Sequence, residues 1–435
     1  MRYRLAAGVA LLTVIQAITS SALAEFSMII EQEIFLDESL NAQKYELTLQ
    51  PEWTASITNN TDMTFIGKIR ADALDNISSR QEKPENYAKL NGPLTAGSHG
   101  EISIREWYID TEIQHTFWRI GKQQVVWGQA DGLKILDVIN PQNFSEFILD
   151  EFEDSRIPLW MLNVEIPTSE ESSLQILWIP DLTYHEFAAE GTIFRLSSPL
   201  FVPKSNIVQL NTTKPDSVLS DSDIGLRYST FYNGWDLNIN YLYHYLDSPV
   251  LYQQQTNTGV IINSEYERNH LVGASASNVF GDFTLRTEVG YNENTFHLKN
   301  SPSVSDEGDD GIFKSPEIAS VIGLDWQGLT DIFISVQWFQ SHLFDYDQQL
   351  VRPQNNHIAS LLFRQTFLNE SLELNLLSLY GFELKDSSSQ LELSYLLEDN
   401  LKLRFGFDHF SGDKNGLFGQ FNNQSLFKLG FEWGL

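Results

Sequence analysis

The sequence predicts an all-β fold, a transmembrane antiparallel up-and-down β-barrel of the bacterial outer membrane with sixteen to eighteen strands. Three observations support it: an export signal, period-two alternation of apolar residues, and short turns that alternate with long polar segments. After the signal no apolar run is long enough for a membrane helix, although 42% of the residues are hydrophobic. A secreted β-sandwich or solenoid is the alternative, because it also alternates apolar and polar residues.

The amino terminus has the three parts of a secretory signal peptide. Arg2 and Arg4 form a basic start, an apolar run extends from Leu5 to about Ile18, and small residues lead to Ala24. The apolar run is shorter than the roughly 20 residues that a membrane anchor needs. We expect cleavage after Ala24, which makes 1–24 the signal peptide and 25–435 a single barrel domain in the outer membrane.

The clearest alternation lies near the carboxyl end, in the stretch NLKLRFGFDHF. A strand here has one apolar face and one mostly polar face, formed by Leu401, Leu403, Phe405 and Phe407 and by Lys402, Arg404, Gly406 and Asp408. The same period recurs in 235–246, 283–291 and 426–435. In a membrane barrel the apolar face contacts lipid and the polar face lines the lumen.

Short turns and long polar segments divide the chain into these strands. The short turns are Asn233-Gly234, Val279–Asp282, Gln327–Asp331, Leu368–Glu370 and Glu398–Asn400. The long segments are near 76–100, 128–158, 180–221, 246–265, 293–316, 342–355 and 411–424. Bacterial barrels keep short turns in the periplasm and long loops outside. Phe26–Asp37 as a first strand makes eighteen strands, and merging two strands in 157–179 makes sixteen.

The long segment 128–158 contains the acidic stretch EFILDEFEDSRIP. Its carboxylates are Glu146, Asp150, Glu151, Glu153 and Asp154. Apolar residues stand among them at helical spacing, at Phe144, Phe147, Ile148 and Phe152. The pattern predicts a short acidic helix over about 144–155 in a long outer loop.

The acidic helix has three interpretations. If the loop folds into the barrel, the apolar stripe rests on the wall and the acids face basic residues across a constriction. The candidates for those basic residues are Arg105, Arg119, Arg227, Arg286, Arg364 and Arg404. Alternatively the helix is solvated outside the cell and binds divalent cations that bridge lipopolysaccharide, or it contacts another protein.

The stretches GKQQVVWG, INP and SRIPLWML carry a resemblance to a known family. They are similar to an uncharacterised, porin-like family of proteobacterial outer-membrane proteins, domain of unknown function 1302, in which a G-[RK]-Q strand runs into W-G and then an I-N-P turn. The matching residues are Gly121, Lys122, Gln123, Trp127, Gly128, Asn140 and Pro141. The resemblance implies a pore or conduit, in some cases beside an inner-membrane exporter of hydrophobic compounds, and no established substrate.

The same motif residues also have structural explanations. Gly121 and Gly128 relieve crowding where a strand bends, and Trp127 is an interfacial anchor. Asn140-Pro141 reads as a turn, because the residue before proline is pushed out of the helical region.

Composition excludes most other functions. A net charge of −30 argues against nucleic acid, and the absence of Cys excludes disulfides and thiolate metal sites. The nine His residues form no metal-binding pair, and the spacing of His270 and Ser275 puts them on opposite strand faces. We expect no enzyme activity, no cofactor and no metal.

Two functions remain. The first is a porin-like channel for small polar or amphipathic solutes. The second is an outer-membrane conduit or partner of an inner-membrane exporter that handles hydrophobic cargo. A polar lumen favours the first, and an apolar lumen or a lateral opening favours the second. The partners expected in either case are outer-membrane lipid, lipopolysaccharide and a small solute, with the oligomeric state unassigned.

Overall fold

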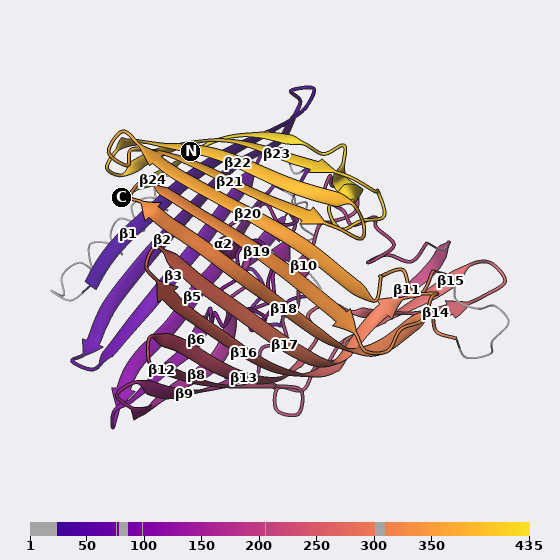
Figure 1. Cartoon of the computed structure of the whole chain (residues 1–435), viewed down its shortest axis with the longest axis horizontal. Helices are drawn as coiled ribbons and strands as arrows, with labels where there is room; N and C mark the ends of the chain where they lie inside the picture. Colours follow the sequence, from indigo (N-terminus) through magenta and orange to yellow (C-terminus); the bar gives the residue numbers. More distant parts are fainter. Residues whose placement is uncertain (1–23, 75, 78–85, 98, 205, 301–308) are drawn as a thin grey trace, which may run out of the picture.

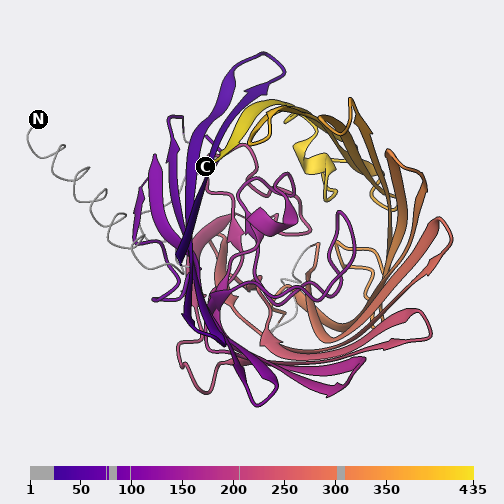
Figure 2. The ribbon, with the colours of Figure 1, turned by 90° about the vertical axis from the view of Figure 1, so that its left-hand side faces the viewer.

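The chain forms a closed antiparallel barrel of eighteen strands in the computed structural model (Figures 1 and 2), which describes residues 24–435 except 75, 78–85, 98, 205 and 301–308. The barrel strands are β1 (Ala24–Asp37), β2 (Ala42–Thr58), β3 (Thr61–Asp72), β5 (Gly100–Ile113), β6 (Thr116–Gln123), β8 (Leu159–Ser169), β9 (Ser172–Ile179), β12 (Asp223–Tyr232), β13 (Trp235–Tyr245), β16 (Arg268–Phe280), β17 (Phe283–Leu298), β18 (Ile312–Leu329), β19 (Ile332–Leu343), β20 (Asn355–Phe367), β21 (Leu372–Gly381), β22 (Asp386–Glu398), β23 (Leu401–Ser411) and β24 (Leu426–Gly434).

Each barrel strand pairs with its neighbour in the chain, and the first strand pairs with the last. In the closing pair Ile30 lies opposite Trp433 and Ile34 lies opposite Leu429. The expected first strand is confirmed as β1, and 157–179 holds two separate strands, so the count is the upper value of the predicted range. The signal peptide lies outside the described residues, apart from Ala24.

The remaining elements lie in the long connections. They are β4 (Thr95–Gly97), β7 (Asn143–Phe144), α2 (Phe152–Ser155), β10 (Glu186–Phe187), β11 (Ile207–Thr213), β14 (Val250–Gln255), β15 (Val260–Glu265) and the 3-10 turn η1 (Gly419–Phe421). Strands β11, β15 and β14 form a separate sheet that extends beyond the barrel wall at one end (Figure 1). None of the helices in the described part of the chain is long and apolar enough to span a membrane.

The two faces of each strand have the predicted chemistry. Phe405 on β23 is 49% exposed and Ile239 on β13 is 62% exposed, on the outer face of the barrel. The alternating polar residues point inward, and Asp408 and Asn240 are almost fully buried there. Outward apolar side chains in contact with lipid and inward polar side chains are the arrangement of a membrane barrel.

The connections also alternate as predicted, with two to four residues at one end and mostly long segments at the other. We call these ends the short-turn end and the long-loop end. Asn233-Gly234 turns between β12 and β13 with positive φ at both residues, as a two-residue hairpin requires.

The acidic helix is not confirmed beyond a single turn. Only Phe152–Ser155 is helical. Phe147 has φ of 58°, in the left-handed region, so a helix cannot continue through it. Asn143–Phe144 instead pairs in parallel with Glu186–Phe187 as β7 and β10, so tertiary contacts override the helical spacing.

We expect Phe405→Arg to impair barrel assembly. A lipid-facing Arg near the membrane midplane costs about 2 to 4 kcal/mol, and Phe405 is on the lipid side of β23. Lys402→Gln is the matched control, because Lys402 on the same strand points into the lumen near Glu432. The folded fraction, read from the heat-dependent shift on a gel and from the urea midpoint, should fall only for Phe405→Arg. Equal loss in both variants would contradict the assignment of the two faces.

Candidate functional site

The segment 124–158, which we call the inner loop, leaves β6 and crosses the interior of the barrel before it enters β8 (Figure 2). Asn140 joins its two ends. The Val125 N–H donates to Asn140 Oδ1 at 2.7 Å, and Asn140 Nδ2 donates to the carbonyls of Gln123 and Ile157 at 3.3 and 3.0 Å. The Asn140 side chain thus holds the two ends of the inner loop together.

The start of the inner loop is fixed to the wall by the motif residues. Gln123 Nε2 donates to the carbonyls of Arg119, Gly121 and Met161 at 3.2 to 3.3 Å. Lys122 Nζ donates to the Ile104 carbonyl at 2.6 Å. Gly121 has φ of 136°, and a side chain there would collide with the backbone of the neighbouring strand β5. These contacts agree with a structural role for this end of the motif.

Trp127 lies inside the barrel, so the interpretation as an interfacial anchor is wrong. Its side chain is 1% exposed, and its Nε1 donates to Gln175 Oε1 at 2.8 Å. The indole rests on Gly225 of β12, where an added Cβ would stand 3.0 Å from the ring. The inward face of β12 therefore leaves space for the loop.

Leu136 occupies a second such space further along the wall. It is fully buried and covers Gly273 of β16 and Gly290 of β17. A Cβ on Gly290 would stand 3.3 Å from the Leu136 side chain, and one on Gly273 would be closer still. Glycines on the lumen face of three strands thus form the floor on which the first half of the inner loop packs.

Polar side chains of the wall bind the backbone of the same half. Arg286 Nη1 donates to the Gln129 carbonyl, and Arg286 Nη2 forms an ion pair with Asp131. Glu288 accepts hydrogen bonds from the N–H groups of Gln129 and Leu136. These bonds satisfy loop backbone groups that are shielded from water, which would otherwise be costly to bury.

Gln337 of β19 binds the inner loop further around the barrel wall. The Asp131 N–H donates to Gln337 Oε1 at 3.0 Å, and Gln337 Nε2 donates to Asp131 Oδ2 at 2.8 Å. Within the loop, Asp137 accepts from Arg156 at 2.8 Å and from Lys134 at 3.1 Å. The first half of the loop is therefore fixed from β12 to β19.

The second half reaches the opposite wall. Phe147 packs among the rings of Phe410, Phe418 and Phe421, with centroids 6.1, 6.4 and 4.7 Å away. Gln390 Nε2 on β22 donates to the Ile148 carbonyl at 3.1 Å. Together the two halves divide the lumen into a larger space toward the long-loop end and a smaller one below.

A buried charge network lies where the second half meets β1 and β2. Lys44 is 2% exposed and forms ion pairs with Glu33 at 2.6 Å, with Glu46 at 3.7 Å and with Glu146 of the inner loop. Arg70 pairs with Glu46. Lys44 and its wall partners Glu33 and Glu46 were missed in the sequence, although Lys44, Glu46 and Thr48 alternate with apolar residues in the same period as the other strands.

The five acids of the stretch 146–154 have different surroundings. Glu146 is bound to Lys44, and Asp154 pairs with Arg105 at 3.2 Å. The carboxylates of Asp150, Glu151 and Glu153 accept no hydrogen bond from the described residues. Burial raises the pKa of Asp150 to about 6, with Glu33 and Asp154 adding to the increase and Lys44 and Lys68 opposing it.

Four of the six candidate arginines meet the inner loop or lie near its acids. Arg105, Arg227 and Arg286 bond to the loop at Glu153, Val126 and Gln129. Arg404 pairs with Glu31 and Glu432 in the wall, and Glu151 lies near enough to act on it electrostatically. Arg119 and Arg364 instead pair with Asp110 and Glu373 on neighbouring strands.

Two cavities flank the second half of the inner loop. The larger, which we call the vestibule, has a volume of about 900 Å³ and lies toward the long-loop end. The smaller, which we call the lower cavity, has a volume of about 110 Å³ and is lined by eight carboxylates and five basic side chains. Asp150 lines both cavities, so the two spaces adjoin at this carboxylate.

Acidic side chains outnumber basic ones in the lining of the lower cavity. Its acids are Glu31, Glu33, Glu46, Glu146, Asp150, Glu151, Asp154 and Glu392, and its bases are Lys44, Lys68, Arg70, Arg404 and Lys428. Fixed charge of one sign in a narrow, low-dielectric space concentrates counter-ions.

An eighteen-stranded barrel with a loop folded into its lumen has the fold of the outer-membrane porins. OpdK of Pseudomonas aeruginosa, in a structure with vanillate, matches at 10% identity over 95% of this chain and 98% of that one, with a TM-score of 0.55. OccAB2 of Acinetobacter baumannii matches at 11% over 95% and 98%, with a TM-score of 0.54. OccK2 of P. aeruginosa, in complex with glucuronate, matches at 9% over the same shares, also with 0.54.

The family model for DUF1302, described as a protein of unknown function, matches residues 8–415. The chain belongs to this family, as the short motif indicated. No curated protein matches the sequence.

We expect Asn140→Ala to loosen the inner loop. The change removes three hydrogen bonds and leaves the buried Val125 N–H without its acceptor, a loss of about 1 to 3 kcal/mol for that group alone. Limited proteolysis of the folded barrel should then cut within 124–158 where the wild type resists. Asn60→Ala, in an exposed two-residue turn at the short-turn end, is the control. If Asn140→Ala resists proteolysis as well as the wild type does, Asn140 does not hold the ends of the inner loop together.

Proposed function

We propose that this protein is a channel of the bacterial outer membrane, exported by its signal peptide, that admits small amphipathic solutes past the inner loop. The observation that carries the proposal is Asp150, which lines both the vestibule and the lower cavity. A solute that moves along the lumen must pass this carboxylate. The long-loop end would then face the outside and lipopolysaccharide, and the short-turn end the periplasm.

The chemistry of the two cavities supports an amphipathic solute rather than a purely polar one. Apolar side chains such as Leu196, Val250 and Phe296 line the vestibule. Charged side chains line the lower cavity. A solute with an apolar part and a charged group would find a favourable contact in each. Vanillate and glucuronate, bound in two of the similar structures, are carboxylates, whereas the free carboxylates here favour a positive group.

The alternative, a conduit that hands hydrophobic cargo from an inner-membrane exporter, draws support from the apolar vestibule alone. Adjacent barrel strands are paired all the way round in the described residues, including β1 with β24, which gives no lateral opening. The charged lower cavity would also oppose a fully apolar cargo. We therefore favour the channel.

Neutralising the free acids of the inner loop should reduce cation selectivity. In the triple variant Asp150→Asn, Glu151→Gln and Glu153→Gln, the reversal potential across a planar bilayer under a salt gradient should shift toward the nonselective value, because fixed negative charge is lost from the passage. Asp345→Asn, an exposed carboxylate in a loop at the same end, is the control.

Salt separates the charge effect from a change in pore width. At about 1 M salt the Debye length is near 3 Å, so the selectivity difference between the triple variant and wild type should shrink. An unchanged reversal potential in the folded triple variant at low salt would count against the passage at Asp150.

Acid should have the same effect on the wild type. Because burial raises the pKa of Asp150 to about 6, the carboxylate is mostly charged at pH 7.5 and mostly neutral at pH 5. Cation selectivity should fall as the pH is lowered through 6, and Asp150→Asn should remove most of that step. Glu146, Glu33, Asp154, Lys44 and Lys68 also face this group. A step of equal size in Asp150→Asn would show that Asp150 does not cause it.

A further inference from the structure

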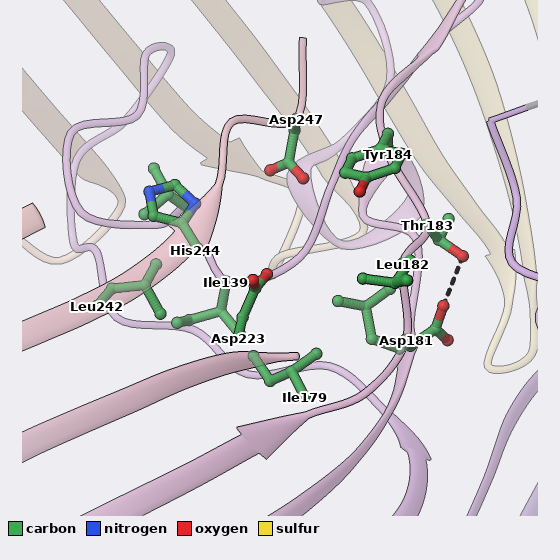
Figure 3. Close-up of a pocket in the computed structure, with 12 residues that line it drawn as sticks. Ile139, Ile179, Asp181, Leu182, Thr183, Tyr184, Asp223, Leu242, His244 and Asp247 are labelled. Carbon is green, nitrogen blue, oxygen red and sulfur yellow. Dashed lines mark hydrogen bonds between the residues drawn. The ribbon is translucent and has the colours of Figure 1, made fainter. Parts of the chain in front are cut away.

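A small polar alcove opens from the side of the vestibule. The alcove and the vestibule adjoin each other, because Val138, His244 and Asp247 line both. The alcove has a volume of about 10 Å³, enough for one water-sized group. Ile139, Ile179 and Leu242 form its apolar side (Figure 3).

Two of the three carboxylates in the alcove are already satisfied. Asp181 accepts from Thr183 Oγ1 at 2.7 Å, the bond drawn in Figure 3, and from the Trp160 N–H at 2.9 Å. Asp223 pairs with Arg268 at 2.6 Å and accepts from the Tyr245 N–H at 3.1 Å. Arg268 is further held over the rings of Tyr243 and Tyr245, so it is not available to a second carboxylate.

The third carboxylate, Asp247, has neither a donor nor a cation among the described residues. Its backbone is fixed, because the His185 N–H donates to its carbonyl at 3.1 Å. Burial and the nearby Asp223 raise the pKa of Asp247 well above its ordinary value. A carboxyl group in this position gains most from a positively charged partner.

Tyr184 supplies a second unsatisfied group. Its side chain is 3% exposed, and its buried hydroxyl has no hydrogen-bond partner among the residues that the structure describes. The ring stacks on Tyr266 with centroids 3.7 Å apart, and the Tyr184 N–H donates to the Asn86 carbonyl at 2.9 Å, which together hold the side chain in place. Figure 3 shows the hydroxyl of Tyr184 and the carboxylates of Asp247 and Asp223 directed toward a common space. A buried hydroxyl without a partner is costly unless a ligand or a water completes it.

The basic side chains of the vestibule are all neutralised. Lys134 pairs with Asp137 at 3.1 Å, Arg195 with Glu190 at 2.8 Å, and Arg352 with Glu317 at 2.6 Å. Asp247 and Asp150 are the carboxylates of the vestibule lining that have no partner within the described part of the chain, whereas Asp386 accepts from two backbone N–H groups. The groups available to a ligand are therefore carboxyl groups, and a bound cation would favour their ionised form.

We propose that the vestibule and the alcove form one binding site for an amphipathic primary amine. The ammonium group would occupy the alcove and donate to Asp247 and Tyr184, and the apolar body would rest in the vestibule. The volume of about 900 Å³ is in the range of small-molecule sites, which is about 300 to 1,000 Å³. The proposal rests on the channel function above and names its class of solute. From the alcove, the amine would move next to Asp150 at the passage.

The test uses the full barrel, folded in detergent and checked by its heat-dependent gel shift. Calorimetry measures binding of phenethylamine, and 3-phenylpropionate and 2-phenylethanol serve as probes that keep the ring but replace the ammonium with a carboxylate or a hydroxyl. We expect the amine to bind at least about tenfold more tightly than either, because only the ammonium group places a positive charge against the Asp247 carboxylate.

Two variants locate the ammonium group. Asp247→Asn should weaken amine binding about tenfold and leave the binding of 2-phenylethanol unchanged. Tyr184→Phe should weaken it about threefold, because a neutral hydrogen bond is lost. Asp345→Asn, with an exposed carboxylate in another loop, is the matched control and should bind as wild type does.

Equal binding of phenethylamine and 3-phenylpropionate to wild type would overturn the proposal. Full-strength amine binding by Asp247→Asn would also overturn it. If Asp247→Asn does not fold, the wild-type preference among the three probes and the Tyr184→Phe result decide. Conductance of the wild type is measured separately: amine binding without a channel would refute only the channel function, and a channel without amine preference would refute only this site.

Discussion

The requirement that no backbone polar group meet lipid without a partner governs this molecule. A sheet can satisfy it only by closing on itself, and here β1 pairs with β24 in a continuous antiparallel register from Ile29 opposite Gly434 to Asp37 opposite Leu426. Closure then forces every second side chain inward. The inward chemistry, the volume of the lumen and the need to fill part of it all follow from that one constraint.

An eighteen-stranded barrel encloses more space than its wall side chains fill, and the inner loop occupies part of it. The loop can lie there because glycines and polar side chains on the inner face of the wall match it. Gly225, Gly273 and Gly290 leave room for Trp127 and Leu136, and Arg286 and Glu288 bind loop backbone groups. A glycine weakens a strand, so three glycines on one patch of the lumen face indicate close approach of another segment.

Charge is distributed unevenly over the lumen. The basic residues that line the vestibule are bound to carboxylates, and the remaining free carboxylates include Asp150 and Asp247. The overall charge of −30 agrees with this local excess but does not locate it. The location comes from pairing, since an acid next to an arginine attracts a cation much less than an unpaired acid in a cavity.

The sequence by itself determined the barrel: period-two alternation, the export signal and the alternation of short turns with long segments led to the correct class and to a range that includes the observed count. These signals are local, because the two faces of a strand and the residues of a turn lie within a few positions of one another. The position of β1 could be read for the same reason. The family was also readable, from a motif of about 40 residues, and the match over 8–415 agrees.

Only the tertiary structure decided what lies inside. Lys44 and Glu146 are 102 positions apart and Gln390 and Ile148 are 242 apart, so no local pattern could pair them. The helical spacing of Phe144 to Phe152 failed because β7 pairs with β10, from a distant part of the chain, and this pairing fixes the backbone differently. The alcove was not predicted for the same reason. Tyr184 follows β9, Asp223 begins β12 and Asp247 follows β13, and the pairing of these three strands brings the residues to one space.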